Sequence, residues 1–414
     1  MSTYLLRGAA VAALSLALTL SGCALPERQP AVPVTDTTRA VVPGLPANVR
    51  YWVGSDISEF AREGLESVRR EQAYRARQGL RGPLPPAHFL ALSGGGDDGA
   101  FGAGLLNGWS ATGTRPVFKG VTGISTGALI APFAFLGPEY DAVLKEVYTG
   151  TRQSDIFHQR SALAAINNDG MADTRPLWTL LGRYVDDAFL KRVADEYAQG
   201  RLLLIATTDI DARRPVIWNM GAIAASGAPG AAALFRSIML ASASIPGAFP
   251  PVMIDVEVDG RRYQEMHVDG GTAAQVFLYP PALDLKALGR QQGLTRERHA
   301  WIIRNARLDP EWASVERRTL DIAARAVSSL ILTQGIGDLY RIYATTQRDG
   351  VDYNLAYIGK DFTVEHKEDF DPDYMRPLFE YGERLARAGY PWQKAPPGYV
   401  APAATPGARV ATGR

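Results

Sequence analysis

The sequence predicts an α/β fold in which helices cover both faces of a mostly parallel β-sheet. From His88 onward, short apolar segments alternate with longer helix-like segments, and this alternation is typical of α/β domains. The segment 202–207 is apolar at almost every position, as expected of a strand that is buried on both faces of a parallel sheet.

The individual elements are separated by segments that contain glycine or proline, which mark turns. We expect strands over 88–92, 118–124, 202–207, 301–304 and 353–358, and helices over 100–109, 126–136, 320–346 and 373–388. The pair Asp259-Gly260, between 254–256 and Tyr263, predicts a β-hairpin.

The chain divides into five segments along its length. We expect a signal peptide over 1–22, an extended tether rich in proline over 23–50, a helical extension over 51–84, the main α/β domain over 85–390, and a Pro/Ala/Gly-rich, disordered tail over 391–414.

Composition narrows the class of protein. Hydrophobic residues make up 46% of the chain and charged residues 21%, which is ordinary for a soluble globular protein. The net charge of +1 predicts no nucleic-acid partner. The single cysteine excludes an intramolecular disulfide and a cysteine metal cluster, and the five histidines show no ligand spacing. We therefore expect neither a metal nor a cofactor.

The N-terminal segment indicates export and a membrane anchor. Arg7 precedes an apolar run over 9–20 that is too short to span a membrane but long enough for a signal peptide. The following Leu20-Ser21-Gly22-Cys23 resembles the lipobox of bacterial lipoproteins, which implies a lipid on Cys23. Because Ala24 rather than Asp follows, we expect the outer membrane, on the side that faces the periplasm. An uncleaved signal anchor with an incidental cysteine is the alternative.

A candidate nucleophile lies between an expected strand and an expected helix. Gly123-Ile124-Ser125-Thr126-Gly127 has the form G-x-S-x-G, which in this context predicts a nucleophile elbow. Gly123 and Gly127 would permit the sharp turn that exposes the Ser125 hydroxyl at the start of a helix, whose dipole favours a developing oxyanion. The same pentapeptide also arises by chance in glycine-rich proteins.

Two other glycine-rich turns carry candidate catalytic groups. The loop Ser93-Gly94-Gly95-Gly96-Asp97-Asp98-Gly99 follows a strand, and its backbone N–H groups could form an oxyanion hole. A structural turn in which Asp97 or Asp98 caps the next helix is the alternative. Asp269, in Val268-Asp269-Gly270-Gly271, could act as a base or could form only an Asx-turn.

Together, these segments resemble the patatin-like phospholipase family. The stretch 241–252, with Ser244 in place of one alanine, is similar to the family segment that precedes its catalytic aspartate. The resemblance covers 88–277 and extends more loosely to about residue 390. It implies a three-layer α/β/α sandwich and a lipid acyl hydrolase that acts on membrane lipids or other acyl esters. It also implies Ser125 as the nucleophile, Asp269 as its only partner in a Ser–Asp dyad, and an oxyanion hole built by Gly94, Gly95 and Gly96.

In such a mechanism Asp269 accepts the Ser125 proton, and an acyl-enzyme forms and is hydrolysed. A carboxylate is a weak base toward serine, so burial should raise the pKa of Asp269. One position departs from the family pattern: Asp98 stands where arginine is common. Either Asp98 turns away as a helix cap, or the preferred substrate is a less anionic ester.

Two other functions remain open at this stage. An α/β-hydrolase would use a Ser-Asp-His triad, and His299 and His366 both follow Asp269 in the required order. Both lie in charged stretches that are more typical of solvated surface histidines. The other possibility is an envelope lipoprotein that binds lipid but has lost turnover.

Overall fold

A computed structural model describes residues 27–161, 168–310, 312 and 314–400. The signal segment and Cys23 lie outside these residues. The strands are β1 (Arg50–Trp52), β2 (Ala87–Leu92), β3 (Gly120–Gly123), β4 (His158–Gln159), β5 (Ala172–Asp173), β6 (Leu202–Asp209), β7 (Arg214–Asn219), β8 (Val252–Val258), β9 (Arg261–Asp269), β10 (Arg298–Arg304) and β11 (Asp352–Tyr357). The α-helices are α2 (Ile57–Arg77), α3 (Gly99–Ala111), α4 (Thr126–Leu136), α5 (Asp141–Gly150), α6 (Gln153–Ile156), α8 (Arg175–Tyr184), α9 (Asp187–Ala198), α10 (Met220–Ala225), α11 (Ala231–Ser242), α12 (Leu285–Gln291), α13 (Thr319–Asp349) and α14 (Pro372–Arg387).

The main sheet has the strand order β1-β7-β6-β3-β2-β10-β11. From β6 to β11 every neighbouring pair is parallel, while β7 and β1 add an antiparallel edge. The expected α/β architecture with a mostly parallel central sheet is therefore confirmed for the centre of the molecule.

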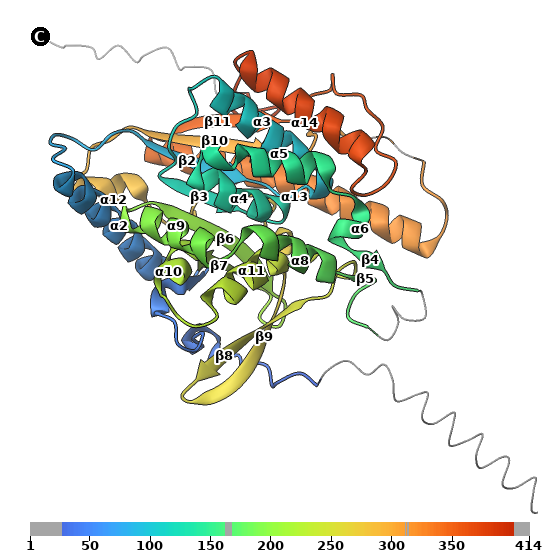
Figure 1. Cartoon of the computed structure of the whole chain (residues 1–414), viewed down its shortest axis with the longest axis horizontal. Helices are drawn as coiled ribbons and strands as arrows, with labels where there is room; N and C mark the ends of the chain where they lie inside the picture. The colour runs from blue at the N-terminus through green and yellow to red at the C-terminus, as the bar shows by residue number, and fades with distance from the viewer. Residues whose placement is uncertain (1–26, 162–167, 311, 313, 401–414) are drawn as a thin grey trace, which may run out of the picture.

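The sheet separates two layers of helices (Figure 1). Successive residues of a strand point to opposite faces, so Leu90 and Leu92 of β2 join the core under α3, α4 and α14, whereas Ala91 joins the smaller core with α13. α3 packs along α14 on the first face, and their glycines allow close backbone approach. The result is the three-layer arrangement that the resemblance implied.

β3 and β9 pair with the same side of β6 and approach one another from opposite directions. β3 runs parallel to β6 and ends where Gly123 pairs with Ile205. β9 continues along the same edge from the opposite direction and ends where Asp269 pairs with Thr207. The ends of β3 and β9 therefore converge within two β6 residues of one another, which brings the turn after β3 close to Asp269.

Both terminal segments pack on the domain more than the sequence indicated. The expected tether over 23–50 is held from Arg28 onward: Arg28 binds Asp211, and Val41 forms a β-bridge with Glu257. The tail expected to be disordered from residue 391 is ordered at its start, where Trp392 packs against Trp109 and Trp301. Apolar aromatic area explains this docking, because a partly buried tryptophan ring helps to offset the entropy of ordering a few residues.

Within the described part of the chain, every helix is too short or too polar to cross a bilayer.

Candidate active site

Ser125 lies at the turn from β3 to α4 in a strained backbone conformation. Its φ of 54° and ψ of −127° fall in a region that non-glycine residues rarely occupy. The flanking glycines permit the turn: a Cβ atom on Gly123 would lie 2.4 Å from the Gly127 carbonyl oxygen, and one on Gly127 would lie 2.3 Å from the Leu92 carbonyl oxygen. Ser125 itself is 8% exposed. The local geometry is that of a nucleophile elbow.

Asp269 ends β9, and the Ser125 side chain lies close enough to its carboxyl group to favour the ionised form. Its Oδ1 also accepts the N–H of Gly271 at 2.6 Å. Burial raises the pKa of Asp269 to about 7, although the hydrogen bonds from Gly271 and Ser125 partly offset this rise. The direction is the one expected of a carboxylate that must serve as a base near neutral pH.

The end of α11 and the residues that follow it hold both catalytic candidates in place. The Ser125 N–H donates to Ser242 Oγ at 3.0 Å, and Ser242 Oγ donates to the Ala206 carbonyl of β6 at 2.7 Å. The Asp269 N–H donates to the Ser244 carbonyl at 2.8 Å. In the sequence, this segment is marked only by its resemblance to the family segment that precedes the catalytic aspartate. Its physical role is to fasten the elbow and the end of β9 to one support.

The glycine loop lies against Ser125, but only some of its backbone N–H groups are available to form an oxyanion hole. A Cβ atom on Gly94 would lie 3.1 Å from the Ser125 Cβ, so a side chain there would fit only if Ser125 shifted by a few tenths of an ångström. The Gly94 N–H already donates to the Gln275 carbonyl at 3.0 Å. Gly94 is therefore not available as a donor, contrary to the expectation for all three glycines. Gly95 and Gly96 are partly exposed, and Gly96 lines the cavity beside Ser125.

The two aspartates of this loop face the C-terminal part of the domain. Asp97 Oδ2 accepts the N–H of Phe370 at 2.9 Å and lies 2.7 Å from His366 Nε2. Asp98 Oδ1 accepts the Tyr374 hydroxyl at 2.6 Å, and neither aspartate caps α3 through its side chain. Asp98 thus turns away from the site, but toward a tyrosine of α14 rather than to the helix N-terminus.

The histidines considered for a triad have other partners. His366 pairs with Asp97, and this hydrogen bond raises the pKa of His366 to about 9 despite partial burial. His299 lies 3.1 Å from Asp352 and stacks on His88. His299 pairs in register with His88, at the beginning of β2. It therefore lies near the N-terminal ends of the parallel strands, whereas the elbow lies at their C-terminal ends. The geometry therefore gives no support to a Ser-Asp-His triad.

A cavity of about 500 Å³ opens beside Ser125. Most of its lining is apolar and comes from α4, α6, α8 and the segment 243–249. A narrower apolar cavity shares Leu129, Ile156, Leu177 and Phe370 with it and extends between α4, α5 and α8. The run 128–135 forms mainly core, since only Leu129 of that run lines the larger cavity.

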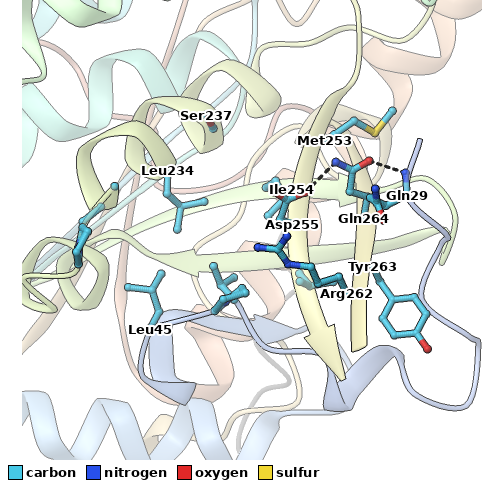
Figure 2. Close-up of a pocket in the computed structure, with 16 residues that line it drawn as sticks. Gln29, Leu45, Leu234, Ser237, Met253, Ile254, Asp255, Arg262, Tyr263 and Gln264 are labelled. Carbon is cyan, nitrogen blue, oxygen red and sulfur yellow. Dashed lines mark hydrogen bonds between the residues drawn. The ribbon is translucent and has the colours of Figure 1, made fainter. Parts of the chain in front are cut away.

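A second hollow, of about 480 Å³, lies between α11, the β8–β9 hairpin and the N-terminal segment (Figure 2). Gln29, Asp255 and Gln264 form a hydrogen-bonded row along it. Neither Ser125 nor Asp269 lines this hollow. Of the two catalytic candidates, Ser125 lines the first cavity.

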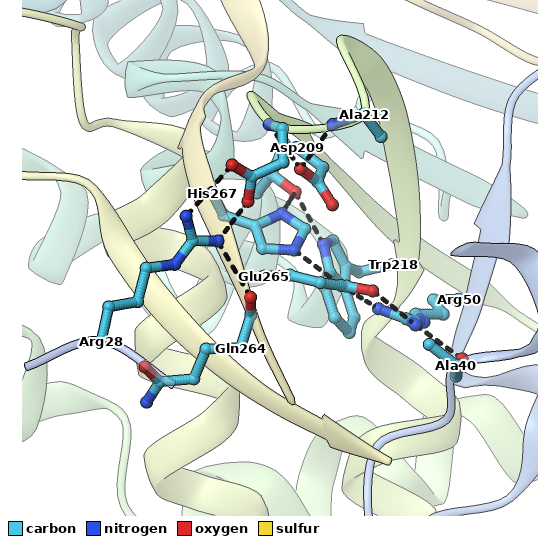
Figure 3. Close-up of polar contacts among 11 residues, drawn as sticks. Arg28, Ala40, Arg50, Asp209, Ala212, Trp218, Gln264, Glu265 and His267 are labelled. Carbon is cyan, nitrogen blue, oxygen red and sulfur yellow. Dashed lines mark hydrogen bonds and ion pairs between the residues drawn. The ribbon is translucent and has the colours of Figure 1, made fainter. Parts of the chain in front are cut away.

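Asp209, Glu265 and His267 offer donor atoms within 4.8 Å of one another, which raises the question of a metal (Figure 3). These atoms are committed to protein partners. Glu265 pairs with Arg50, His267 Nδ1 lies 2.8 Å from Thr207 Oγ1, and Asp209 Oδ1 accepts the N–H groups of Asp211 and Ala212. Arg50, which pairs with Glu265, supplies the positive charge that a metal would bring. The network links β9 to β6 and to β1.

The geometry thus defines an α/β protein with a serine at a strand–helix elbow, next to a buried aspartate. Residues 90–281 match the family model of patatin-like phospholipases. The match supports hydrolysis of lipid acyl esters as the activity. No curated protein matches the sequence.

Several solved structures are similar at low identity. VipD from Legionella pneumophila is 9% identical with a TM-score of 0.35, and the match covers 74% of this chain and 67% of that one. Full-length ExoU from Pseudomonas aeruginosa, in complex with SpcU, is 14% identical with a TM-score of 0.33, covering 74% and 52%. Human GIVD cytosolic phospholipase A2 is 9% identical with a TM-score of 0.28, covering 68% and 51%. This chain therefore spans about half the length of the last two proteins.

Proposed function

We propose that the protein is a serine lipid acyl hydrolase of the phospholipase A or esterase type that works through a Ser–Asp dyad. The observation that carries the proposal is the position of Ser125, at a strained elbow that lines an apolar cavity, next to the buried carboxyl group of Asp269. A nucleophile, a base with a raised pKa and unoccupied loop amides are the three parts that acyl transfer requires.

The mechanism follows from these positions. Asp269 accepts the Ser125 proton while Ser125 Oγ attacks the ester carbonyl, and the N–H groups of Gly95 and Gly96 stabilise the oxyanion. Asp269 returns the proton to the leaving alcohol, which leaves the acyl group on Ser125. A water molecule that is deprotonated by Asp269 then releases the fatty acid. With a pKa of about 7 for Asp269, both of its protonation states are accessible near neutral pH.

The cavity supports a substrate with an aliphatic acyl chain. Leu129, Ile156, Leu177 and Phe249 form apolar walls beside Ser125. Asp97, Asp369 and Arg160 also line it. Charged side chains of both signs therefore line the cavity, and Asp97 is paired with His366.

A lipid at Cys23 would hold this domain close to a membrane of the bacterial envelope. Arg28 contacts Asp211 and donates to the Gln264 carbonyl of β9 at 2.9 Å. The chain from Cys23 to Arg28 spans at most about 18 Å when fully extended. A lipid on Cys23 would therefore hold the domain close to the membrane surface. Metabolic labelling with palmitate, lost in Cys23→Ser, tests the anchor, and membrane fractionation tests the outer-membrane location.

Fatty-acid release from phospholipid vesicles and from p-nitrophenyl butyrate tests the activity. We expect release by the parent protein and none above background by Ser125→Ala or Asp269→Asn. A folded parent protein that binds lipid but releases no fatty acid, and that no fluorophosphonate labels, would instead indicate a lipid-binding lipoprotein. Activity in Asp269→Asn, together with loss in His366→Ala, would indicate a triad.

A further inference from the structure

A buried arginine lies directly behind the glycine loop. Arg304 ends β10, is 2% exposed, and donates from Nη1 to the Gly94 carbonyl oxygen at 2.9 Å and to Ser93 Oγ at 3.1 Å. Ser93 Oγ donates in turn to the same carbonyl at 2.7 Å. The Gly94 carbonyl therefore accepts two hydrogen bonds, one of them from a cation.

The Gly94 carbonyl and the Gly95 N–H belong to one peptide group. In a planar trans peptide they point in opposite directions, so an oxygen held toward Arg304 directs the Gly95 N–H away from Arg304. A charge-assisted hydrogen bond to the carbonyl also polarises the peptide and makes its N–H a stronger donor. The N–H of Gly94 itself already donates to the Gln275 carbonyl. The hydrogen bonds to the Gly94 carbonyl therefore orient and polarise the N–H of Gly95.

From these contacts we infer that Arg304 is a positioning residue for catalysis: it orients and polarises the Gly94–Gly95 peptide so that the Gly95 N–H stabilises the oxyanion formed at Ser125. The inference rests on the proposed hydrolase function. Arg304 does not touch the substrate; it acts through the peptide.

The surroundings of Arg304 are built to hold the guanidinium at this point. β10 is parallel to β2, so its end lies beside the glycine loop, and Asn305 donates from its N–H to Ser93 Oγ at 2.8 Å and from Nδ2 to the Ser93 carbonyl at 2.9 Å. Gly335 of α13 leaves space for the guanidinium, since a Cβ atom there would lie 2.8 Å from Arg304 Nη2.

Arg304 remains charged in this position. Burial lowers its pKa to about 10, while the carboxylates of Asp98 and Asp338 act in the opposite direction. Taking a guanidinium out of water is costly. A purely structural role is served elsewhere in this fold by Arg201, which is also buried, donates to the carbonyls of Phe118 and Phe135, and pairs with Glu196. Arg201 is therefore the matched control.

The experiment compares kcat and KM of the full chain on p-nitrophenyl butyrate for the parent, Arg304→Met, Gly335→Ala and Arg201→Met, with the melting temperature of each. Removal of an entire oxyanion donor typically lowers kcat by about 10²- to 10³-fold. Because Arg304→Met weakens such a donor without removing it, we expect kcat to fall on the order of 10- to 100-fold with KM nearly unchanged. Arg201→Met should lower the melting temperature and leave kcat of the folded protein within about twofold of the parent.

Gly335→Ala keeps the inference testable if Arg304→Met does not fold. The added methyl group displaces the guanidinium while alanine favours the helix, so kcat should fall although the melting temperature does not. Unchanged kcat in Gly335→Ala and in any folded Arg304→Met, a rise in KM alone, or an equal loss of kcat in Arg201→Met would overturn the inference. An inactive parent protein would refute the proposed function instead.

Discussion

Replacement of Asp269 by asparagine should abolish activity and at the same time stabilise the protein above neutral pH. Asp269 is fully buried, and burial raises its pKa from the ordinary 3.8 to about 7. A raised carboxyl pKa means that the folded state binds its proton more tightly than the unfolded state does. The stability contributed by the protonated form is complete below about pH 4 and is lost as the pH rises through about 7.

The size of this effect follows from the same values. Each pH unit between the two pKa values corresponds to about 1.4 kcal/mol, so the buried carboxylate lowers the free energy of unfolding by up to about 4 kcal/mol above pH 7. Asparagine has nearly the same shape and no charge to bury. The difference in stability between Asp269→Asn and the parent should therefore be small at pH 4 and grow to a few kcal/mol at pH 8.

Chemical denaturation at pH 4, 6 and 8, with fatty-acid release measured in parallel, tests this prediction. Asp349→Asn is a control of opposite sign: burial alone would raise the pKa of Asp349, but hydrogen bonds from Arg348 and Tyr279 lower it, so its loss should destabilise the protein at pH 8. Equal stability of Asp269→Asn and the parent at pH 8, or retained activity in Asp269→Asn, would refute the reasoning.

Three further substitutions have defined outcomes. Ser125→Gly should be inactive yet more stable than Ser125→Ala by about 1–3 kcal/mol, because glycine relieves the positive φ; thermal unfolding of both variants decides this. Ser242→Ala removes the acceptor of the Ser125 N–H, so it should cost about 1–3 kcal/mol and lower kcat, and wild-type kcat would contradict the bracing role. Leu129→Phe narrows the cavity beside Ser125, so kcat/KM should fall for long acyl esters and stay close to the parent for butyryl esters; an equal effect on both would exclude the cavity as the acyl site.

Local features of the fold could be predicted because short-range sequence patterns determine them. The helix over 126–136 and the hairpin at Asp259-Gly260 have the expected positions, since each depends on glycine placement and apolar periodicity within a few residues. The elbow conformation at Ser125 belongs to the same class of local feature. The strands β1 and β7 were not anticipated, because an antiparallel edge strand is stabilised by distant partners rather than by its own sequence.

The site depends on pairings that a sequence does not display. Ser125 lies next to Asp269 because β3 and β9 end on the same edge of β6. The sequence of neither segment predicts that register. Engagement of the Gly94 amide by Gln275 has the same origin. The residues that brace the loop, Arg304 and Asn305, lie at the end of an ordinary strand and just after it, and they carry no motif. A cationic side chain at the end of an apolar strand next to a glycine loop is the only signal that could have identified Arg304.

The most direct test of the central claim is mass spectrometry of the protein quenched in acid during hydrolysis of a long-chain p-nitrophenyl ester. Nucleophilic attack by Ser125 predicts a mass increase of one acyl group, mapped to the peptide that contains Ser125 and absent from Ser125→Ala. An acyl group on a different residue, or turnover by Ser125→Ala at the parent rate, would contradict the account.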